Sequence, residues 1–152
     1  MIRGHGTREQ AGVHTRPHVK RRTLILPTAP ASVRAARIST AEALALFGLA
    51  PGSLLADAAL LVVSELMTNA VRHAAPQSPS ATVTVSTGAG QLVVAVGDQD
   101  PHTIEMAGPS AGEGLRTVAE LTACFDGEVS VKPALWGRGK TVVARFRLPG
   151  QR

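Results

Sequence analysis

The spacing of apolar residues changes along the first half of the chain and predicts a strand followed by two helices. Thr23–Leu26 is a short run of β-prone residues and predicts a first strand. Over residues 31–47 the apolar positions recur every three or four residues, which predicts an amphipathic helix. A second helix is predicted from Ser53, whose side chain can cap it, to about Ala74.

The second half of the chain switches to strand periodicity. Residues 81–87 alternate between polar and apolar, and residues 91–96 return after a glycine turn, so a hairpin is expected. A third helix over about 115–125 and two more strands, at 129–132 and 141–148, follow. This order predicts an α+β fold, a two-layer sandwich of helices on a mixed, mostly antiparallel sheet.

Composition places the chain among globular proteins with one domain. Hydrophobic residues make up 44% and charged residues 18% of the 152 residues. Cys124 is the only cysteine and cannot form an internal disulfide, so we expect a cytoplasmic protein. The longest apolar run, Leu54–Val63, is interrupted by Asp57 and falls short of the roughly 20 residues that span a bilayer. No membrane association is therefore expected.

The net charge of +5 is concentrated at one end of the chain. Residues 1–22 hold six basic residues against Glu9 alone, whereas ten basic and ten acidic residues follow from Thr23 onward. The composition of residues 1–22 favours a disordered basic tail, followed by a domain over 23–149 and a C-terminal tail over 150–152. Contact of the basic tail with nucleic acid or acidic partners is the other interpretation, but direct nucleic-acid binding is not expected.

Three polar residues form a stripe on the second predicted helix. Glu65, Asn69 and His73 are four residues apart, so their side chains follow one line along the helix. Such a stripe can simply face water, and spacing alone favours that interpretation. The alternative is a binding or catalytic face.

The sequence around this stripe resembles a known motif. Ser64–His73 reads SELMTNAVRH and is similar to the N-box of the GHKL ATPases and kinases, most closely that of the bacterial anti-sigma factor serine kinases. Three later features agree in order: Asp98 after a buried strand, a Gly-x-Gly-Leu before a helix, and Gly139-Lys140-Thr141 before the last strand. The resemblance covers roughly residues 23–149 and implies a Bergerat-type ATP-binding fold.

The resemblance implies a role for each residue of the stripe. Asn69 would be the Mg²⁺ ligand, in keeping with the preference of this cation for oxygen ligands and water. Glu65 would be the catalytic base that polarises an attacking hydroxyl. His73 would contribute packing or a hydrogen bond on the phosphate side.

The other motifs would hold the nucleotide. Asp98 would accept a hydrogen bond from the exocyclic amine of adenine, although an Asp at this point can also simply form a turn. Gly112 and Gly114, followed by Leu115, would let backbone N–H groups approach phosphates at a helix start. Thr141 would complete the adenine site through a water, unless it is an ordinary strand residue.

At the level of function, the resemblance implies an anti-sigma factor serine/threonine kinase that uses ATP and Mg²⁺. Such a protein phosphorylates an anti-anti-sigma protein of the STAS fold, sequesters a sigma factor and thereby regulates transcription, and homodimerisation is expected on the same ground. Two departures favour a catalytically weak or inactive nucleotide-binding switch instead. Residues 98–102 lack the glycines of the wider superfamily, and Glu113 introduces an acid between the phosphate-loop glycines.

Overall fold

Five strands form one sheet in the order β1-β2-β3-β5-β4, and all four pairings between them are antiparallel. The computed structural model describes residues 19–102, 112–134 and 137–150. The predicted two-layer α+β sandwich is confirmed, and the sheet, expected to be mixed and mostly antiparallel, has only antiparallel pairs among the described strands. The strands are β1 (Lys20–Pro27), β2 (Ser80–Gly88), β3 (Gln91–Asp98), β4 (Glu128–Pro133) and β5 (Lys140–Arg147).

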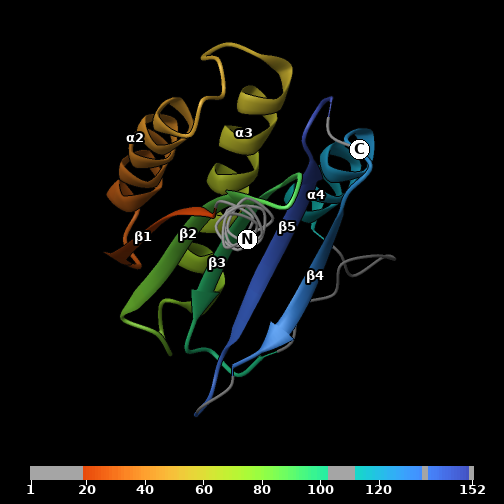
Figure 1. Cartoon of the computed structure of the whole chain (residues 1–152). Coiled ribbons are helices and arrows are strands. Elements are labelled where there is room, and N and C mark those ends of the chain that lie inside the picture. The colour runs from red at the N-terminus through yellow and green to blue at the C-terminus, as the bar shows by residue number, and fades with distance from the viewer. Residues whose placement is uncertain (1–18, 103–111, 135–136, 151–152) are drawn as a thin grey trace, which may run out of the picture.

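The helices cover one face of this sheet, and their order follows the strand order (Figure 1). Helix α2 contacts β1 and β2, α3 contacts β3, and α4 contacts β4 and β5. Ser53 caps α3, as predicted, by accepting a hydrogen bond from the Ala56 N–H at 3.2 Å. The helical elements are α2 (Ala31–Leu46), α3 (Leu54–Asn69), a π-helical turn η1 (Ala70–Ala74) and α4 (Glu113–Cys124).

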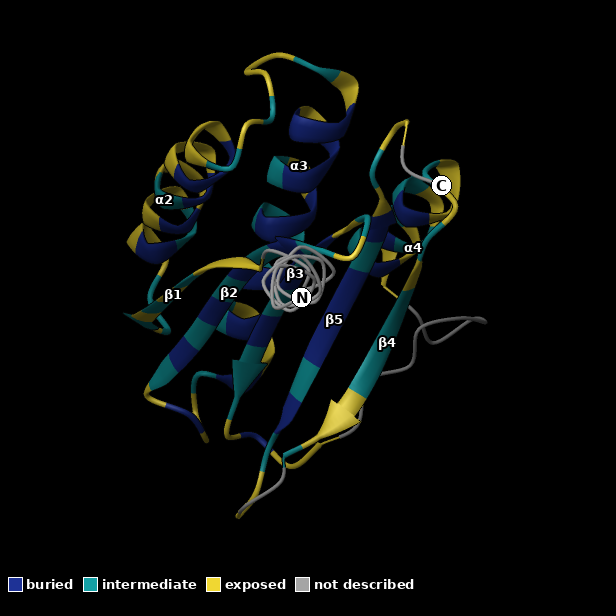
Figure 2. Cartoon of the chain, in the orientation of Figure 1, coloured by how far each residue is buried: buried dark blue, intermediate teal, exposed yellow. Residues whose placement is uncertain are grey.

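The core lies between the two layers, where the alternating strands present their apolar residues to the helices (Figure 2). β2 shows strict alternation, with every second residue buried. On β3 and β5 the inward positions pair across the ladder as Leu92 with Phe146, Val94 with Ala144, and Val96 with Val142. The next pair in this inward column is Asp98 with Lys140, so the apolar face of the sheet ends in two charged residues.

The first strand begins earlier than the sequence indicated. β1 starts at Lys20, so Lys20, Arg21 and Arg22 belong to the sheet and not to a tail that ends at residue 22. Arg22 lies 3.5 Å from the Glu42 carboxylate of α2. The chain from Lys20 onward is therefore basic and not neutral, while residues 1–18, 103–111 and 151–152 of the predicted tails and loop lie outside the described residues.

One stretch, Leu54–Ala74, is long and apolar enough to cross a membrane by length and composition alone, with a mean hydropathy of 1.6. The sequence analysis counted Asp57 as the interruption of this apolar run, whereas the mean hydropathy of the longer stretch stays high in spite of Asp57. The core helix of a globular domain meets the same two criteria, and half of this stretch is buried within the fold. Its buried side chains belong to the core between helices and sheet.

Candidate nucleotide site

The π turn at the end of α3 carries part of a cavity wall. α3 is α-helical to Asn69, and the following five residues widen into η1, in which Ala70 and Ala74 are buried while Arg72 and His73 are exposed. Wide turns of this kind are rare and occur frequently at functional sites. The predicted stripe therefore continues past Asn69 on a wider turn, which carries His73 to the cavity.

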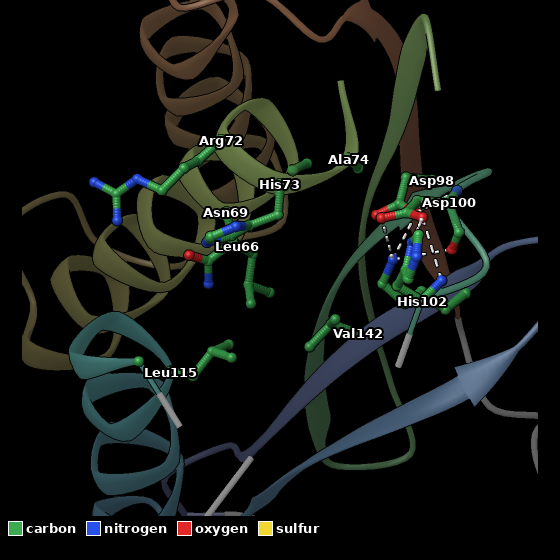
Figure 3. Close-up of a pocket in the computed structure, with 13 residues that line it drawn as sticks. Leu66, Asn69, Arg72, His73, Ala74, Asp98, Asp100, His102, Leu115 and Val142 are labelled. Carbon is green, nitrogen blue, oxygen red and sulfur yellow. Dashed lines mark hydrogen bonds and ion pairs between the residues drawn. The ribbon is translucent and has the colours of Figure 1, made fainter. Parts of the chain in front are cut away.

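A cavity of about 620 Å³ lies between the helix layer and the end of the sheet. Figure 3 shows Asn69 and His73 on one side and Asp98, Asp100 and His102 on the other, while the Arg72 side chain extends away from the carboxylates. Apolar side chains separate the two polar ends. They are Leu66, Ala70, Ala74, Leu115 and Val142.

Lys140 holds the carboxylate end together. Its Nζ donates to Asp98 Oδ1 and to the backbone oxygen of Asp100, both at 3.0 Å, and lies 3.7 Å from Asp100 Oδ2. The Lys140 side chain is 8% exposed, that of Asp98 7% and that of Asp100 4%. The ammonium thus makes two hydrogen bonds and one further ion-pair contact, which compensates charges that would otherwise be costly to bury.

Asp100 is bound from its other side by His102. The Asp100 Oδ1 accepts from the His102 backbone N–H at 3.2 Å and lies 2.6 Å from His102 Nδ1. An ionised carboxylate only accepts hydrogen bonds, so this ring nitrogen carries the proton. Burial raises the pKa of the Asp100 carboxyl, but the hydrogen bonds from His102 and the charge of Lys140 outweigh it, and the pKa is lowered.

We expect Asp100→Asn to lower the free energy of unfolding by about 1–3 kcal/mol at pH 7, because the buried Lys140 and the exposed His102 both lose a charged acceptor. The lowered pKa means that ionised Asp100 stabilises the fold above its ordinary pKa of 3.8, and that this contribution is lost as the pH falls through the lower folded value. Urea unfolding at several pH values between 7 and 3 measures the difference between the wild type and the variant.

The matched control is Asp57→Asn, an exposed carboxylate in the first turn of α3. It should change stability by no more than about 1 kcal/mol. A difference for Asp100→Asn that stays constant down to pH 3, or is absent at pH 7, would contradict this account of the carboxylate end.

The opposite end of the cavity combines an amide with a helix N-terminus. The Asn69 side-chain nitrogen is buried and has no hydrogen-bond partner among the described residues, and Asn69 lines the cavity, so a group bound there could satisfy the amide. Gly112 is the N-cap of α4 and has no side chain, so it does not itself cap the first N–H groups of the helix. A phosphate fits such a helix start because the helix dipole and the N–H groups both favour an anion.

A magnesium ion fits this end only together with phosphates. Among the described residues, no group of three or more His, Cys, Asp or Glu side chains could hold a metal ion. The side-chain oxygen of Asn69 can supply one ligand if the amide is turned toward the cation, and Mg²⁺ commonly takes its remaining ligands from phosphates and water. The Glu113 side chain does not obstruct this arrangement, because Glu113 is exposed and does not line the cavity.

Glu65 lies beside the first turn of α4 and does not line the cavity wall. The Glu65 carboxylate fits there because Gly114 has no side chain. A Cβ at Gly114 would collide with this carboxylate. Gly114 thus serves the position of Glu65, not a direct approach to the cavity, whereas Gly112 and Leu115 do line it.

We therefore expect Gly114→Ala to displace the Glu65 carboxylate. Stability should change by no more than about 1 kcal/mol, because Ala favours the helix and the obstructing group is the end of a flexible side chain. If Glu65 is a base, phosphoryl transfer should fall about 100-fold, and Glu65→Gln combined with Gly114→Ala should be no worse than Glu65→Gln alone. Full transfer by Gly114→Ala would contradict the predicted role of Glu65.

Thr141 lies away from the cavity, and its neighbour Lys140 takes the inward position. Thr141 pairs with Gly97, and its hydroxyl would lie 3.0 Å from a Cβ at that glycine, on the face of the sheet opposite the helices. The predicted site residues that line one cavity are Asn69, His73, Asp98, Gly112 and Leu115, while Glu65, Gly114 and Thr141 do not line it.

The polar cavity residues that the sequence analysis missed are Arg72, Asp100, His102 and Lys140. A signal for Lys140 was present. Val142, Ala144 and Phe146 are apolar residues at alternate positions of the last strand, and period-two alternation places residue 140 on their side. No comparable signal marks Asp100 or His102, because they follow the end of β3.

Two solved structures resemble this fold. The RsbU and RsbW domains of Rv1364c from Mycobacterium tuberculosis superpose with a TM-score of 0.63 at 20% identity, over 85% of this chain and 32% of that one. The histidine kinase domain of the Erythrobacter litoralis EL346 blue-light activated histidine kinase gives 0.51 at 30% identity, over 64% of this chain and 46% of that one. The chain thus spans less than half of either protein.

No curated protein sequence matches the chain at a significant level. A family profile does match, that of the histidine kinase-like ATPase domain, over residues 26–142. This range contains the helix layer, most of the sheet and every residue that lines the cavity. The chain therefore belongs to the histidine kinase-like ATPase domain family.

Proposed function

We propose that the cavity binds ATP with its base toward Asp98 and its phosphates toward Asn69 and Gly112. The observation that carries this proposal is the opposition of the two polar ends across an apolar middle. One end offers the Asn69 amide and a helix start to an anion, which leaves the carboxylate end for the base. Membership in an ATPase domain family supports ATP as the ligand.

We further propose that the chain is an anti-sigma factor serine/threonine kinase that phosphorylates an anti-anti-sigma protein of the STAS fold. In this reaction the hydroxyl oxygen of the partner forms a bond to the γ-phosphorus of ATP, and the bond from that phosphorus to the bridging oxygen breaks and releases ADP. Glu65 accepts the hydroxyl proton and returns it to solvent. Mg²⁺, when bound, neutralises charge on the phosphates.

The test is transfer of labelled phosphate from ATP to the cognate STAS protein. One Ser or Thr of that protein should become labelled, and labelling should require Mg²⁺. The absence of transfer to a folded partner that accepts phosphate from another kinase would overturn the kinase proposal while leaving ATP binding untouched.

We propose sigma-factor sequestration and homodimerisation in the cytoplasm as parts of the same function. The exposed Arg34 and Arg37 on α2 are candidate contacts for a partner, because cations on a free helix face can pair with an acidic surface. Light scattering of the purified chain measures dimerisation. Co-purification of a sigma factor that is lost on addition of unphosphorylated STAS protein would support sequestration.

The second candidate function is a nucleotide-dependent or nucleotide-independent protein switch without catalysis. The ion pair between Lys140 and Asp98 favours it, because the acceptor for a base amine is already engaged within the protein. Titration calorimetry with ATP and Mg²⁺ separates the two functions. The absence of heat at millimolar ATP, with partner binding retained, would favour the switch.

A further inference from the structure

Lys140 occupies the position on Asp98 that a donor from a bound base would take. Its stem rises from the inward column of β5 beside Val142, and its ammonium donates to Asp98 Oδ1 at 3.0 Å. The same oxygen also accepts from the backbone N–H of Asp100 at 2.9 Å. One oxygen of Asp98 is thus fully used inside the protein.

The ion pair also changes how well the remaining oxygen can accept. A hydrogen bond to an uncompensated carboxylate is about twice as strong as one between neutral groups. With the Lys140 ammonium in contact and largely withdrawn from water, the carboxylate of Asp98 is compensated before any ligand arrives. An amine on a base would therefore gain much less from Asp98 than it would from a free carboxylate.

Lys140 itself is held by the carboxylate end. Its Nζ donates to Asp98 Oδ1 and to the Asp100 backbone oxygen at 3.0 Å each, and it lies 3.7 Å from Asp100 Oδ2, close enough for an ion pair but too far for a hydrogen bond. Turning the ammonium toward a ligand would leave one of these oxygens uncompensated, which is costly at such burial. The lysine is therefore kept in place by these contacts, and Asp98 Oδ1 stays engaged within the protein.

We propose that Lys140 is a specificity-determining residue that makes the base end of the cavity indifferent to the exocyclic amine of a purine. This inference rests on the proposed nucleotide-binding function. The apolar middle and the phosphate end hold the nucleotide, and the Lys140–Asp98 pair removes the contact that would distinguish a base with an amine from one without it.

The experiment compares two probes that differ only in the amine: ATP and purine riboside triphosphate, each with Mg²⁺. Calorimetry gives the ratio of their affinities for the wild type, for Lys140→Thr and for Lys140→Met. Threonine suits a strand and removes the charge, while methionine keeps the length of the stem. Lys132→Thr, a change at an exposed lysine on the neighbouring strand, is the matched control.

We expect the wild type and Lys132→Thr to bind the two probes within about threefold of each other. In both Lys140 variants the ratio should rise to about tenfold or more in favour of ATP, the value of a hydrogen bond to a charged acceptor. Circular dichroism and thermal unfolding show whether each variant is folded. If neither Lys140 variant folds, the wild-type ratio alone decides.

Two results would overturn the inference while leaving ATP binding intact. The first is a wild-type preference for ATP of tenfold or more, since Asp98 would then read the amine with the lysine in place. The second is a folded Lys140 variant whose ratio does not rise. If the wild type binds neither probe but Lys140→Thr binds ATP, the inference about Lys140 is supported. The proposal that the native chain binds ATP is then contradicted. No binding by any of the proteins overturns both.

Discussion

Asn69→Ala is expected to lower phosphoryl transfer at least about 100-fold, the loss typical when one group that stabilises transition-state charge is removed. Asn69 lines the cavity at its phosphate end, and in our proposal its amide oxygen is the only protein ligand to Mg²⁺. Thermal stability should not fall, because the side-chain nitrogen is buried and has no partner within the described part of the chain, so that its removal relieves an unsatisfied group. Labelled phosphate transfer and thermal unfolding measure the two effects.

Thr68→Ala is the matched control for Asn69→Ala. Thr68 is the neighbouring residue of α3 and does not line the cavity. Asn69→Asp adds a second test, since it keeps an oxygen ligand and should retain more transfer at high Mg²⁺ than Asn69→Ala. Transfer by Asn69→Ala at the wild-type rate, or a marked loss of its thermal stability, would show that Asn69 is a structural residue.

Gly139→Ala is expected to destabilise the fold by about 3 kcal/mol or more, the sum of left-handed strain and a collision with backbone. Gly139 has φ +120°, and a Cβ there would collide with the Asp98 backbone oxygen and lie 2.8 Å from Gln99 Cα. Neither neighbour can rotate away as a side chain could. The chain after β3 would have to shift, and the Lys140–Asp98 pair would shift with it. Urea unfolding gives the loss.

Gly137→Ala separates strain from collision. Gly137 lies two residues away with φ +72°, and nothing lies within 4 Å of a Cβ at that position. Its loss should be about 1 kcal/mol, from backbone strain alone. Equal losses for the two variants would mean that the close approach of Gly139 to Asp98 contributes nothing.

The fold was predictable because each element carries its own local pattern. Pro27 and Gly48 end elements where the structure ends them, and the capping by Ser53 follows from side-chain chemistry. The start of β1 at Lys20 was missed, because the basic residues 20–22 look like a tail. Pairing with Thr87 and its neighbours on β2 makes them a strand, and such long-range pairing overrides local composition.

The candidate site was predictable only in part, because a motif gives the order of residues along the chain and not the face of the strand or helix on which each side chain lies. Asn69, Asp98 and Gly112 were expected to share a site, and they line one cavity. Thr141 was expected there because the motif names it, but the alternation of β5 turns it away and brings Lys140 in. The π turn has no local signature either, since Ala70–Ala74 continues the helical pattern of α3 without a break.

Lys140 stands opposite Asp98 because of the register between β3 and β5, so this register determines which side chain meets Asp98 at the base end of the cavity. A slip of one residue in that ladder would turn every side chain of β5 to the other face. Thr141 would then stand inward opposite Asp98, and a neutral hydroxyl would replace the cation without any change in amino-acid composition. The same slip would turn Val142, Ala144 and Phe146 out of the core, so the buried side chains of β5 also fix which residue faces Asp98.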